Sequence, residues 1–208
     1  MRFVSVVRPL SLLIAGLVAG TVVFGQTVRQ FAVGQAAVAV VGQKNFSANL
    51  PGAAANEFGT VTGLAVAGDR LIVGDGGLSF STPSNNRVLI FNNLPGLAAD
   101  ASASIVIGQE DFGKNDPGLS EKTFNRPVGV ATDGVRLAVA DAGNNRVLIF
   151  NRIPTTNGAS ADVAVGQPDF KTGTPDTTNN RLRGPNGVFF QGGRLFLADT
   201  LNLRVLIY

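Results

Sequence analysis

Three aspartates recur at matching places in the sequence, and asparagine and arginine follow each of them. The set comprises Asp75, Asp141 and Asp199, with Asn86, Asn145 and Asn202 and with Arg87, Arg146 and Arg204. Carboxylate and amide oxygens are ligands that calcium prefers, so one interpretation is a ring that binds calcium or a polar ligand. In the other, Asp and Asn hydrogen-bond the backbone of tight turns. Because binding sites usually break internal symmetry, we favour this structural interpretation.

The recurring arginines allow a comparable choice. They could form a positive rim for anions, but one planar guanidinium can also satisfy several acceptors at once. We therefore expect each to pair with a neighbouring aspartate or with backbone carbonyl groups between repeats, and we expect recurring glutamines to satisfy backbone groups where a strand ends. The further positions are Arg70, Arg136 and Arg194, and Gln43, Gln109 and Gln167.

Histidine and cysteine are both absent from the chain. Without histidine there is no Ser-His-Asp triad, and the commonest general base and zinc ligand are missing. Any catalysis would depend on carboxylates, lysine, tyrosine or a metal held by oxygen ligands. Without cysteine there are no disulfides, so stability must come from a hydrophobic core.

One segment departs from the repeated pattern. Residues 77–84 form an insertion in which Phe80 stands among Ser, Thr and Pro. Loops on rigid scaffolds often carry binding residues, so Phe80 is a candidate for a recognition loop. A tolerated surface insertion is the alternative, and we favour it.

The elements that must position these residues are short and repeat along the chain. Residues 127–150 align with 185–208 without a gap, and a third copy runs over 61–75 and 85–91. Within each copy, short runs of β-branched and aromatic residues are bounded by Gly, Asn and Asp, which predicts strands joined by tight turns. A fourth element, a small apolar run followed by Gly-Gln, occurs at 38–46, 104–112 and 162–170.

Four antiparallel strands in each repeated unit predict an all-β fold built of β-propeller blades. The sequence holds about three such units, whereas propellers typically have about four to eight blades. The leading segment 38–46 could supply the fourth strand of the blade that contains 185–208. A fragment of a longer ring, two associating copies and an open arc remain as alternatives, and we favour the fragment.

Residues 129–141, 140–150 and 198–208 resemble NHL repeats of bacterial exported proteins. The segment VGQPDF at 165–170 is similar to a Gly-Gln-Pro-Asp-Phe segment common in a long-repeat branch of that family. The resemblance covers about 38–208 and implies a six-bladed propeller or a part of one, usually a binding scaffold. Blade number and the insertion depart from the family pattern.

The N-terminal segment has the pattern of a secretory signal. Arg2 and Arg8 precede the apolar and small residues of 9–25, with a plausible cut after Gly25. An uncleaved membrane anchor is the alternative, but the apolar run is shorter than the roughly 20 residues that a spanning helix needs. We expect a signal peptide over 1–25, a lead-in over 26–37 and blades over 38–208, with repeats at about 61–112, 127–170 and 185–208.

Export predicts a secreted or periplasmic protein that meets the membrane only through its signal. Without Arg2 and Arg8 the chain is close to neutral and has no run of basic residues. Nucleic-acid binding needs clustered positive charge, so no nucleic acid partner is expected.

We expect a non-catalytic scaffold, without a cofactor, for a protein, small-molecule or glycan ligand, with self-association as one way to complete the ring. The alternative is a calcium-dependent hydrolase, lactonase-like or esterase-like, of the wider propeller group. The resemblance implies that such enzymes hold calcium through Glu, Asn and Asp on inner strands. The expected inner strands, 63–66, 129–132 and 187–190, contain only Thr132 as a polar side chain, so no ligand set can be matched.

Overall fold

The computed structural model describes residues 31–77 and 84–208. The chain divides into two compact units, Met1–Ala36 and Ala37–Tyr208. The expected signal segment 1–25, the first part of the lead-in and Phe80 lie outside the described residues. Within the described residues, no helix is both long and apolar enough to cross a membrane.

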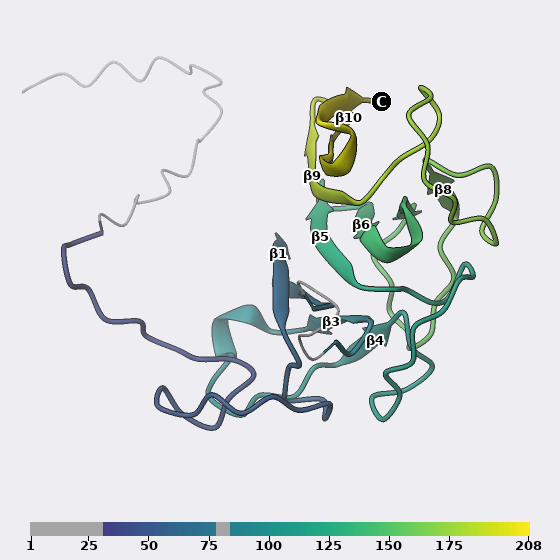
Figure 1. The fold of residues 1–208 in the computed structure, drawn as a ribbon. Coiled ribbons are helices and arrows are strands. Elements are labelled where there is room, and N and C mark those ends of the chain that lie inside the picture. The colour runs from purple at the N-terminus through teal and green to yellow at the C-terminus, as the bar shows by residue number, and fades with distance from the viewer. Residues whose placement is uncertain (1–30, 78–83) are drawn as a thin grey trace, which may run out of the picture. The chain divides into compact units, whose positions relative to one another are not determined.

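The second unit is all-β and consists of three antiparallel sheets, which confirms the predicted fold class (Figure 1). The first sheet contains β1 (Val61–Ala67), β2 (Arg70–Asp75), β3 (Arg87–Phe91) and β4 (Ile105–Ile107). The second contains β5 (Pro127–Thr132), β6 (Leu137–Asp141), β7 (Arg146–Phe150) and β8 (Val163–Val165). The third contains β9 (Pro185–Gln191), β10 (Arg194–Asp199) and β11 (Arg204–Ile207).

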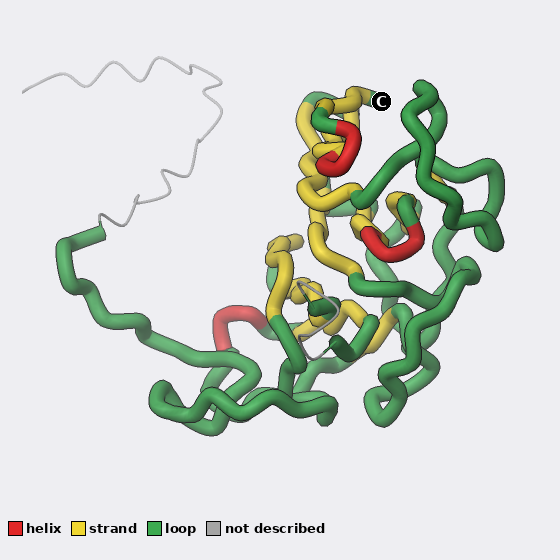
Figure 2. Tube along the Cα trace, in the orientation of Figure 1, coloured by secondary structure: helices red, strands yellow, loops and turns green. Residues whose placement is uncertain are grey.

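Helical structure is confined to short 3-10 turns in the part of the chain that the structure describes (Figure 2). They are η1 (Leu94–Gly96), η2 (Ala142–Asn144) and η3 (Thr200–Asn202). Two of them, η2 and η3, join the second and third strands of their sheets. They therefore set how an aspartate at the end of one strand meets an arginine at the start of the next.

Neighbouring strands pair in sequence order, and the first two sheets use the same register. Leu89 of β3 lies opposite Val106 of β4, and Leu148 of β7 lies opposite Ala164 of β8. The third sheet has three strands, because β11 pairs with β10 alone. The expected strand over 38–46 does not form, since none of the strands in the described residues supplies it with backbone partners.

Glycine lets the first strands of successive sheets approach closely. β5 lies beside both β1 and β9 (Figure 1). A Cβ atom added to Gly63 of β1 would lie 2.6 Å from the carbonyl oxygen of Val128, and one added to Gly129 of β5 would lie 2.1 Å from that of Asn186. Real Cβ atoms do not come so close to backbone, so the sheet-to-sheet contact requires glycine at both positions.

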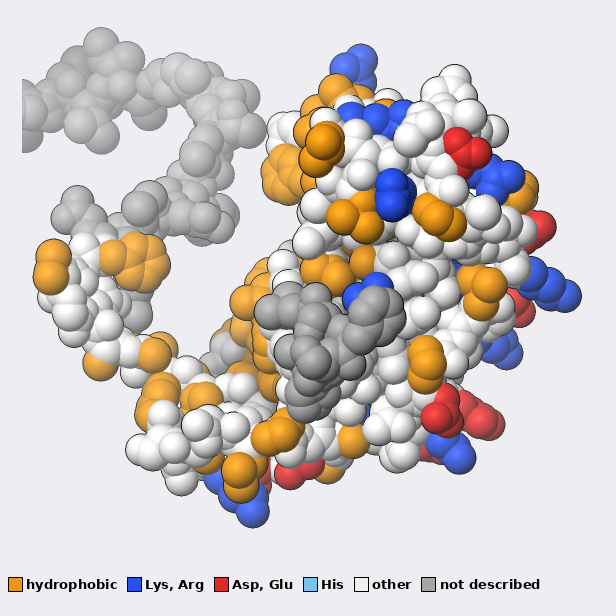
Figure 3. Space-filling model, viewed as in Figure 1, with side chains coloured by type: hydrophobic (Ala, Val, Ile, Leu, Met, Phe, Trp, Pro, Cys, Tyr) orange, Lys and Arg blue, Asp and Glu red, His pale blue; other side chains and the backbone are white. Residues whose placement is uncertain are grey.

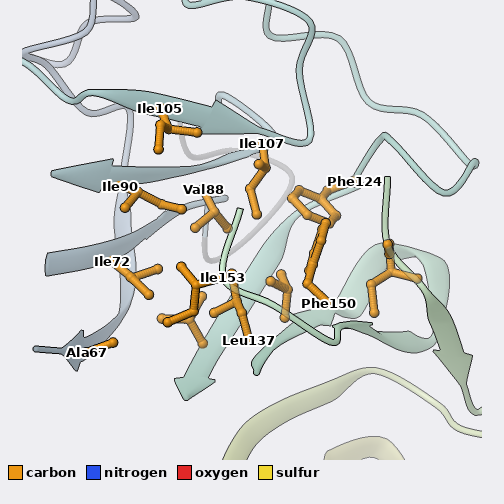
Figure 4. Packing of buried hydrophobic residues seen from close by; sticks show 14 residues of the cluster. Ala67, Ile72, Val88, Ile90, Ile105, Ile107, Phe124, Leu137, Phe150 and Ile153 are labelled. Atoms are coloured by element: carbon orange, nitrogen blue, oxygen red, sulfur yellow. The ribbon is translucent and has the colours of Figure 1, made fainter. Parts of the chain in front are cut away.

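The main apolar core lies between the first and second sheets (Figure 4). Val88 and Ile90 of β3 pack there with Leu137 of β6 and Phe150 of β7. The opposite face of β3 is also buried, because Leu89 and Phe91 pack under the loop that carries Phe58. Burial on both faces explains why the strand sequence is a continuous apolar run rather than an alternating one.

Identical residues differ in exposure at the last sheet. Val88 and Val147 are 0% exposed, whereas Val205, at the matching position of β11, is 67% exposed. The first strands differ in the same way, since Leu64 of β1 is 64% exposed and Val130 of β5 only 7%. Hydrophobic side chains are visible at the surface beside β1 and β9 (Figure 3).

Two apolar surfaces therefore bound the row of sheets. We call Leu64 and Val66 of β1 the leading face. We call Phe189 of β9, with Val205 and Ile207 of β11, the trailing face. Both faces present the residue types that are buried between sheets elsewhere.

Candidate functional site

The aspartate that ends β6 is surrounded by hydrogen-bond donors. Oδ2 of Asp141 accepts hydrogen bonds from Nε of Arg146 at 2.8 Å and from Nδ2 of Asn144 at 2.8 Å. Oδ1 accepts from the backbone N–H of Asn125 at 2.7 Å. The Asp141 and Arg146 side chains are both fully buried. The two residues lie directly opposite each other in the β6–β7 register, so the short turn between these strands creates the pair.

The first and third sheets repeat this arrangement. Asp75 pairs with Arg87 at 2.9 Å and accepts from Nδ2 of Asn85 and from the backbone N–H of Gly59. Asp199 pairs with Arg204 at 2.8 Å and accepts from Nδ2 of Asn202 and from the backbone N–H of Arg183. The third pair is less enclosed than the others, because the Arg204 side chain is 27% exposed.

The arginines use their remaining donors on backbone carbonyl groups. Arg146 donates from Nη1 to the carbonyl oxygen of Phe170 and from Nη2 to those of Ser120 and Thr123. One guanidinium thus holds the loop that enters its sheet and the loop that leaves it. Arg87 binds four loop carbonyl groups in the same way, those of Ala53, Ala54, Glu57 and Phe112.

Burial dominates the electrostatics of the central pair. It raises the pKa of the Asp141 carboxyl to about 6, against the lowering effects of the Arg146 guanidinium and the donors from Asn125 and Asn144. The carboxyl is therefore ionised at neutral pH, where its charge is matched by that of Arg146. Both of its oxygens already accept bonds from the chain, which leaves this carboxylate little capacity for a metal ion or substrate.

The second asparagine of each turn makes a different contact. Asn86 and Asn145 have left-handed backbones, with φ of 49° and 55°. Oδ1 of Asn86 accepts from the backbone N–H of Arg126 at 2.8 Å, and Oδ1 of Asn145 accepts from that of Gly184 at 2.9 Å. Each of these asparagines therefore ties its own sheet to the start of the next one.

Asn202 occupies the position of Asn85 and Asn144 beside the aspartate, in agreement with the ungapped alignment of 127–150 with 185–208. The left-handed position of the third turn is held by Leu203, with φ of 55°.

The other repeated polar residues also contact the backbone. Nε2 of Gln109 donates to the carbonyl oxygens of Asn86 and Asp116, and Nε2 of Gln167 to those of Asn145 and Thr174. These bonds agree with the expectation for glutamines at strand ends.

Arg136 connects the second and third sheets. Its Nε donates to Asp133 at 2.7 Å, and its guanidinium lies over the ring of Phe190, 4.7 Å from the ring centroid. Thr132, the polar residue of the expected inner strands, donates from Oγ1 to the carbonyl oxygen of Arg136 at 2.6 Å. Its hydroxyl is thus engaged in a turn.

A cleft of about 450 Å³ opens where β5 and β9 begin. Arg126, Arg183, Asn145, Asn186 and Leu201 are among the residues that line it. Both arginines are non-repeated, since Arg126 aligns with Gly184 and Arg183 with Asn125. We call this site the arginine cleft.

Sequence reasoning missed the arginine cleft. The two cations lie far apart along the chain, and the signal that could have found them is their break with repeat symmetry. Among the described residues that line the cleft there is no Asp or Glu. Across the described chain, no group of three or more His, Cys, Asp or Glu is placed to hold a metal ion.

The second sheet and its entering segment decide the family of the repeat. A family model described as NHL repeat matches residues 124–150. Residues 124–150 are an NHL repeat. Its aspartate, asparagine and arginine network recurs in the sheets on either side.

Several solved structures are similar to the chain. Glutaminyl cyclase of Myxococcus xanthus has a TM-score of 0.39 at 14% identity, over 73% of this chain and 56% of that one. The PQQ-bound aldose sugar dehydrogenase of Streptomyces coelicolor has a TM-score of 0.41 at 18% identity, over 80% and 48%. A nidogen/laminin complex gives a TM-score of 0.35 at 15% identity, over 72% and 59%.

The chain thus spans about half of the length of these proteins. No curated protein matches it.

Proposed function

We propose that the chain is a non-catalytic interaction scaffold whose NHL blades present the arginine cleft to an acidic segment of a protein partner. One observation carries the proposal. The repeated carboxylates are filled by donors of the chain itself, while the cleft outside them is lined by two arginines and by no described acid.

The chemistry of the cleft suits carboxylates. Guanidinium groups bind carboxylates through paired, charge-assisted hydrogen bonds. Arg183 is exposed and Arg126 is half-buried, and both line the cleft. An acidic segment would meet the positive charge of both guanidinium groups there without displacing a bond of the repeated network.

The blades hold the backbone of both arginines in place. The backbone N–H of Arg126 donates to Oδ1 of Asn86, and that of Arg183 donates to Oδ1 of Asp199 at 2.7 Å. The repeated polar residues therefore support binding by fixing the positions of non-repeated ones. Export to the periplasm or the exterior belongs to the same proposal, on the strength of the apolar segment 9–25.

A calcium-dependent hydrolase would need oxygen ligands from several blades. Thr132 and Thr62 are engaged with the carbonyl oxygens of Arg136 and Pro127. We therefore propose the scaffold in preference to the hydrolase. A melting temperature that rises with calcium and falls again with a chelator would favour the hydrolase instead.

The test is binding of a fluorescent oligoglutamate peptide to the full chain. We expect binding that weakens with salt, and a loss of at least about tenfold in the double variant Arg126→Gln, Arg183→Gln. The matched control, Arg152→Gln with Arg194→Gln, removes the same charge from exposed positions and should retain affinity within about twofold.

Each variant is first compared with the parent chain by thermal melting, so that a folding defect is recognised. The proposal fails if the parent chain does not bind oligoglutamate at low salt. It also fails if both double variants lose affinity equally, because net charge would then account for the binding.

A further inference from the structure

A polar cavity of about 470 Å³ lies where the end of the first sheet meets the loop that enters the second. Gln109 and Glu110, which follow β4, line this cavity. Ser120, Lys122 and Thr123 of the entering loop line it as well. Its volume is within the range of about 300–1,000 Å³ that is usual for small-molecule sites. We call it the glutamine cavity.

The loop between β7 and β8 completes the lining through Asn157 and Gly158. Hydrogen bonds hold this loop on the first sheet. The backbone N–H of Val106 donates to Oδ1 of Asn157 at 3.0 Å, and that of Gly158 donates to the carbonyl oxygen of Val106 at 3.0 Å. The lining is therefore fixed by the two sheets, and a ligand would meet a preformed site with little ordering cost.

The loop that enters the third sheet has a matching position, and the arginine network identifies it. Nη2 of Arg146 donates to the carbonyl oxygen of Thr123, and Nη2 of Arg204 donates to that of Arg181. Thr123 and Arg181 are therefore equivalent positions in two successive entering loops. The first of them lies at the glutamine cavity, and the second beside Gln167.

The glutamine side chains at these two places are satisfied differently. Oε1 of Gln167 accepts a 3.0 Å hydrogen bond from Nη1 of Arg181. Nε2 of Gln109 donates to the carbonyl oxygens of Asn86 and Asp116, which fixes the orientation of its amide. Oε1 of Gln109 accepts no hydrogen bond from any described residue, although Gln109 is only 5% exposed. Because buried carbonyl oxygens ordinarily have a donor, Oε1 is the acceptor that Gln109 offers to the cavity.

Thr123 is too short to reach that acceptor as an arginine does. Its Oγ1 lies 2.9 Å from Oγ of Ser120, so its hydroxyl is engaged within its own loop. At the equivalent position, the longer side chain of Arg181 carries a guanidinium onto the glutamine. A guanidinium from outside the chain would therefore find, in the glutamine cavity, the acceptor that the chain itself supplies with arginine one repeat later.

Two charged residues of the cavity break the repeat. Glu110 stands where the next repeat has Pro168, and Lys122 stands where it has Asn180. A carboxylate pairs with a guanidinium through charge-assisted hydrogen bonds, and an ammonium group pairs with a carboxylate. The two side chains carry opposite charges, so the cavity suits a ligand that carries both a guanidinium and a carboxylate.

We propose that the glutamine cavity binds a guanidinium compound of the arginine class. The guanidinium of the ligand donates to Oε1 of Gln109 and to the Glu110 carboxylate, and the α-carboxylate of free L-arginine pairs with Lys122. The shared chemistry is the guanidinium, which either the free amino acid or an arginine side chain of a peptide can supply. The site is separate from the arginine cleft, because the two have no described lining residue in common.

The first test is an NMR titration of the isotope-labelled full chain with L-arginine, followed through the side-chain amide of Gln109. We expect that resonance to shift with a Kd of about 1 mM or below. L-citrulline, which has an uncharged urea group in place of the guanidinium, should bind at least about tenfold more weakly. Agmatine lacks the carboxylate and separates the sources. Weaker binding of agmatine assigns the site to the free amino acid, and equal binding assigns it to a guanidinium on a peptide.

The second test gives the cavity the residue that the next repeat has. Thr123→Arg should place a guanidinium on Oε1 of Gln109 and weaken L-arginine binding at least about tenfold, without lowering the melting temperature. Thr177→Arg adds the same charge at an exposed position outside the cavity and should bind like the parent chain.

The third test removes the charge that pairs with the guanidinium. Glu110→Gln should weaken binding of both L-arginine and agmatine at least about tenfold. Glu121→Gln is the matched control, because the Glu121 side chain does not line the cavity, and it should retain the affinity of the parent chain.

Four results would each overturn the proposal. They are an unshifted Gln109 amide at about 10 mM L-arginine, equal affinity for L-arginine and L-citrulline, unchanged affinity in a folded Thr123→Arg chain, and equal effects of Glu110→Gln and Glu121→Gln. If Thr123→Arg does not fold, the ligand comparison and the two glutamate variants decide the question.

Discussion

The side chain of Asn145 accepts a 2.9 Å hydrogen bond from the backbone N–H of Gly184, so one residue of the second blade fixes where the third begins. Asn86 does the same for the second blade through the N–H of Arg126. The aspartate and arginine pairs act differently, because their bonds join strands and loops around one blade. The repeated polar residues thus divide into a set within blades and a set between blades.

Removal of the link between blades should destabilise the fold. Asn145→Ala leaves the N–H of Gly184 without this acceptor and places alanine in a left-handed backbone. We expect a loss of about 1–3 kcal/mol in the free energy of unfolding, measured by urea denaturation. The exposed Asn151→Ala is the control. Equal effects of the two substitutions would mean that the link contributes nothing.

Removal of the carboxylate from a fully buried ion pair should lower the free energy of unfolding more than removal of the carboxylate from the pair whose arginine is partly exposed. Asp141→Asn leaves the Arg146 guanidinium buried without a counter-charge, which costs about 3–5 kcal/mol in other buried pairs. Asp199→Asn should cost clearly less, because the Arg204 side chain is 27% exposed and water can solvate its charge. Urea midpoints of the two variants give the comparison. A larger loss for Asp199→Asn would contradict the assigned role of burial.

Glycine should be required in one inner strand and dispensable in the next. Gly129→Ala would place a Cβ 2.1 Å from the carbonyl oxygen of Asn186, and the resulting backbone shift should cost about 1–3 kcal/mol. Gly187→Ala occupies the same strand position but meets only an ordinary contact with Ala198. Thermal melting of dilute protein should therefore separate the two variants. Equal melting temperatures would exclude close sheet packing at Gly129.

Protonation of the Asp133 carboxyl, in the turn before β6, should lower the stability of the fold in acid. Burial tends to raise the pKa of the Asp133 carboxyl, but hydrogen bonds and charge from Arg136, with the N–H of Val135, lower it to about 2. Because the folded pKa lies below the ordinary value of 3.8, this group stabilises the fold above about pH 4. That contribution is lost as the pH falls toward 2.

Carbon NMR of the Asp133 carboxyl measures this pKa directly. In Arg136→Gln it should move back toward its ordinary value, and the acid-induced loss of stability from this group should become smaller. An unchanged pKa would show that Arg136 does not hold the carboxyl. Lys122→Gln removes a charge from another exposed position and serves as the control.

Much of the blade could be predicted from sequence because its determinants are local. Residues 146–150 were expected to form a strand and do form β7, since β-branched residues and flanking turn residues determine it over a few positions. The strand expected over 38–46 does not form, because its formation depends on a partner strand and not on local sequence. A strand needs a neighbour for its backbone groups, and its apolar run carries no information about whether that neighbour is present.

The candidate site was the feature that the sequence predicted least well. Arg126 and Arg183 are joined only by the packing of the second blade against the third, so no local pattern connects them. Leu203, at the left-handed position, carries no signal of its backbone conformation.

The sequence alone determines the repeat, its strands and the pairing of aspartate with arginine, because these depend on residues close together in the chain. Tertiary structure decides which copies of a repeated residue are buried. Val88, Val147 and Val205 stand in identical strand sequences, yet only the first two are covered. Burial depends on whether another sheet lies against the strand, and the residues of one repeat cannot encode that.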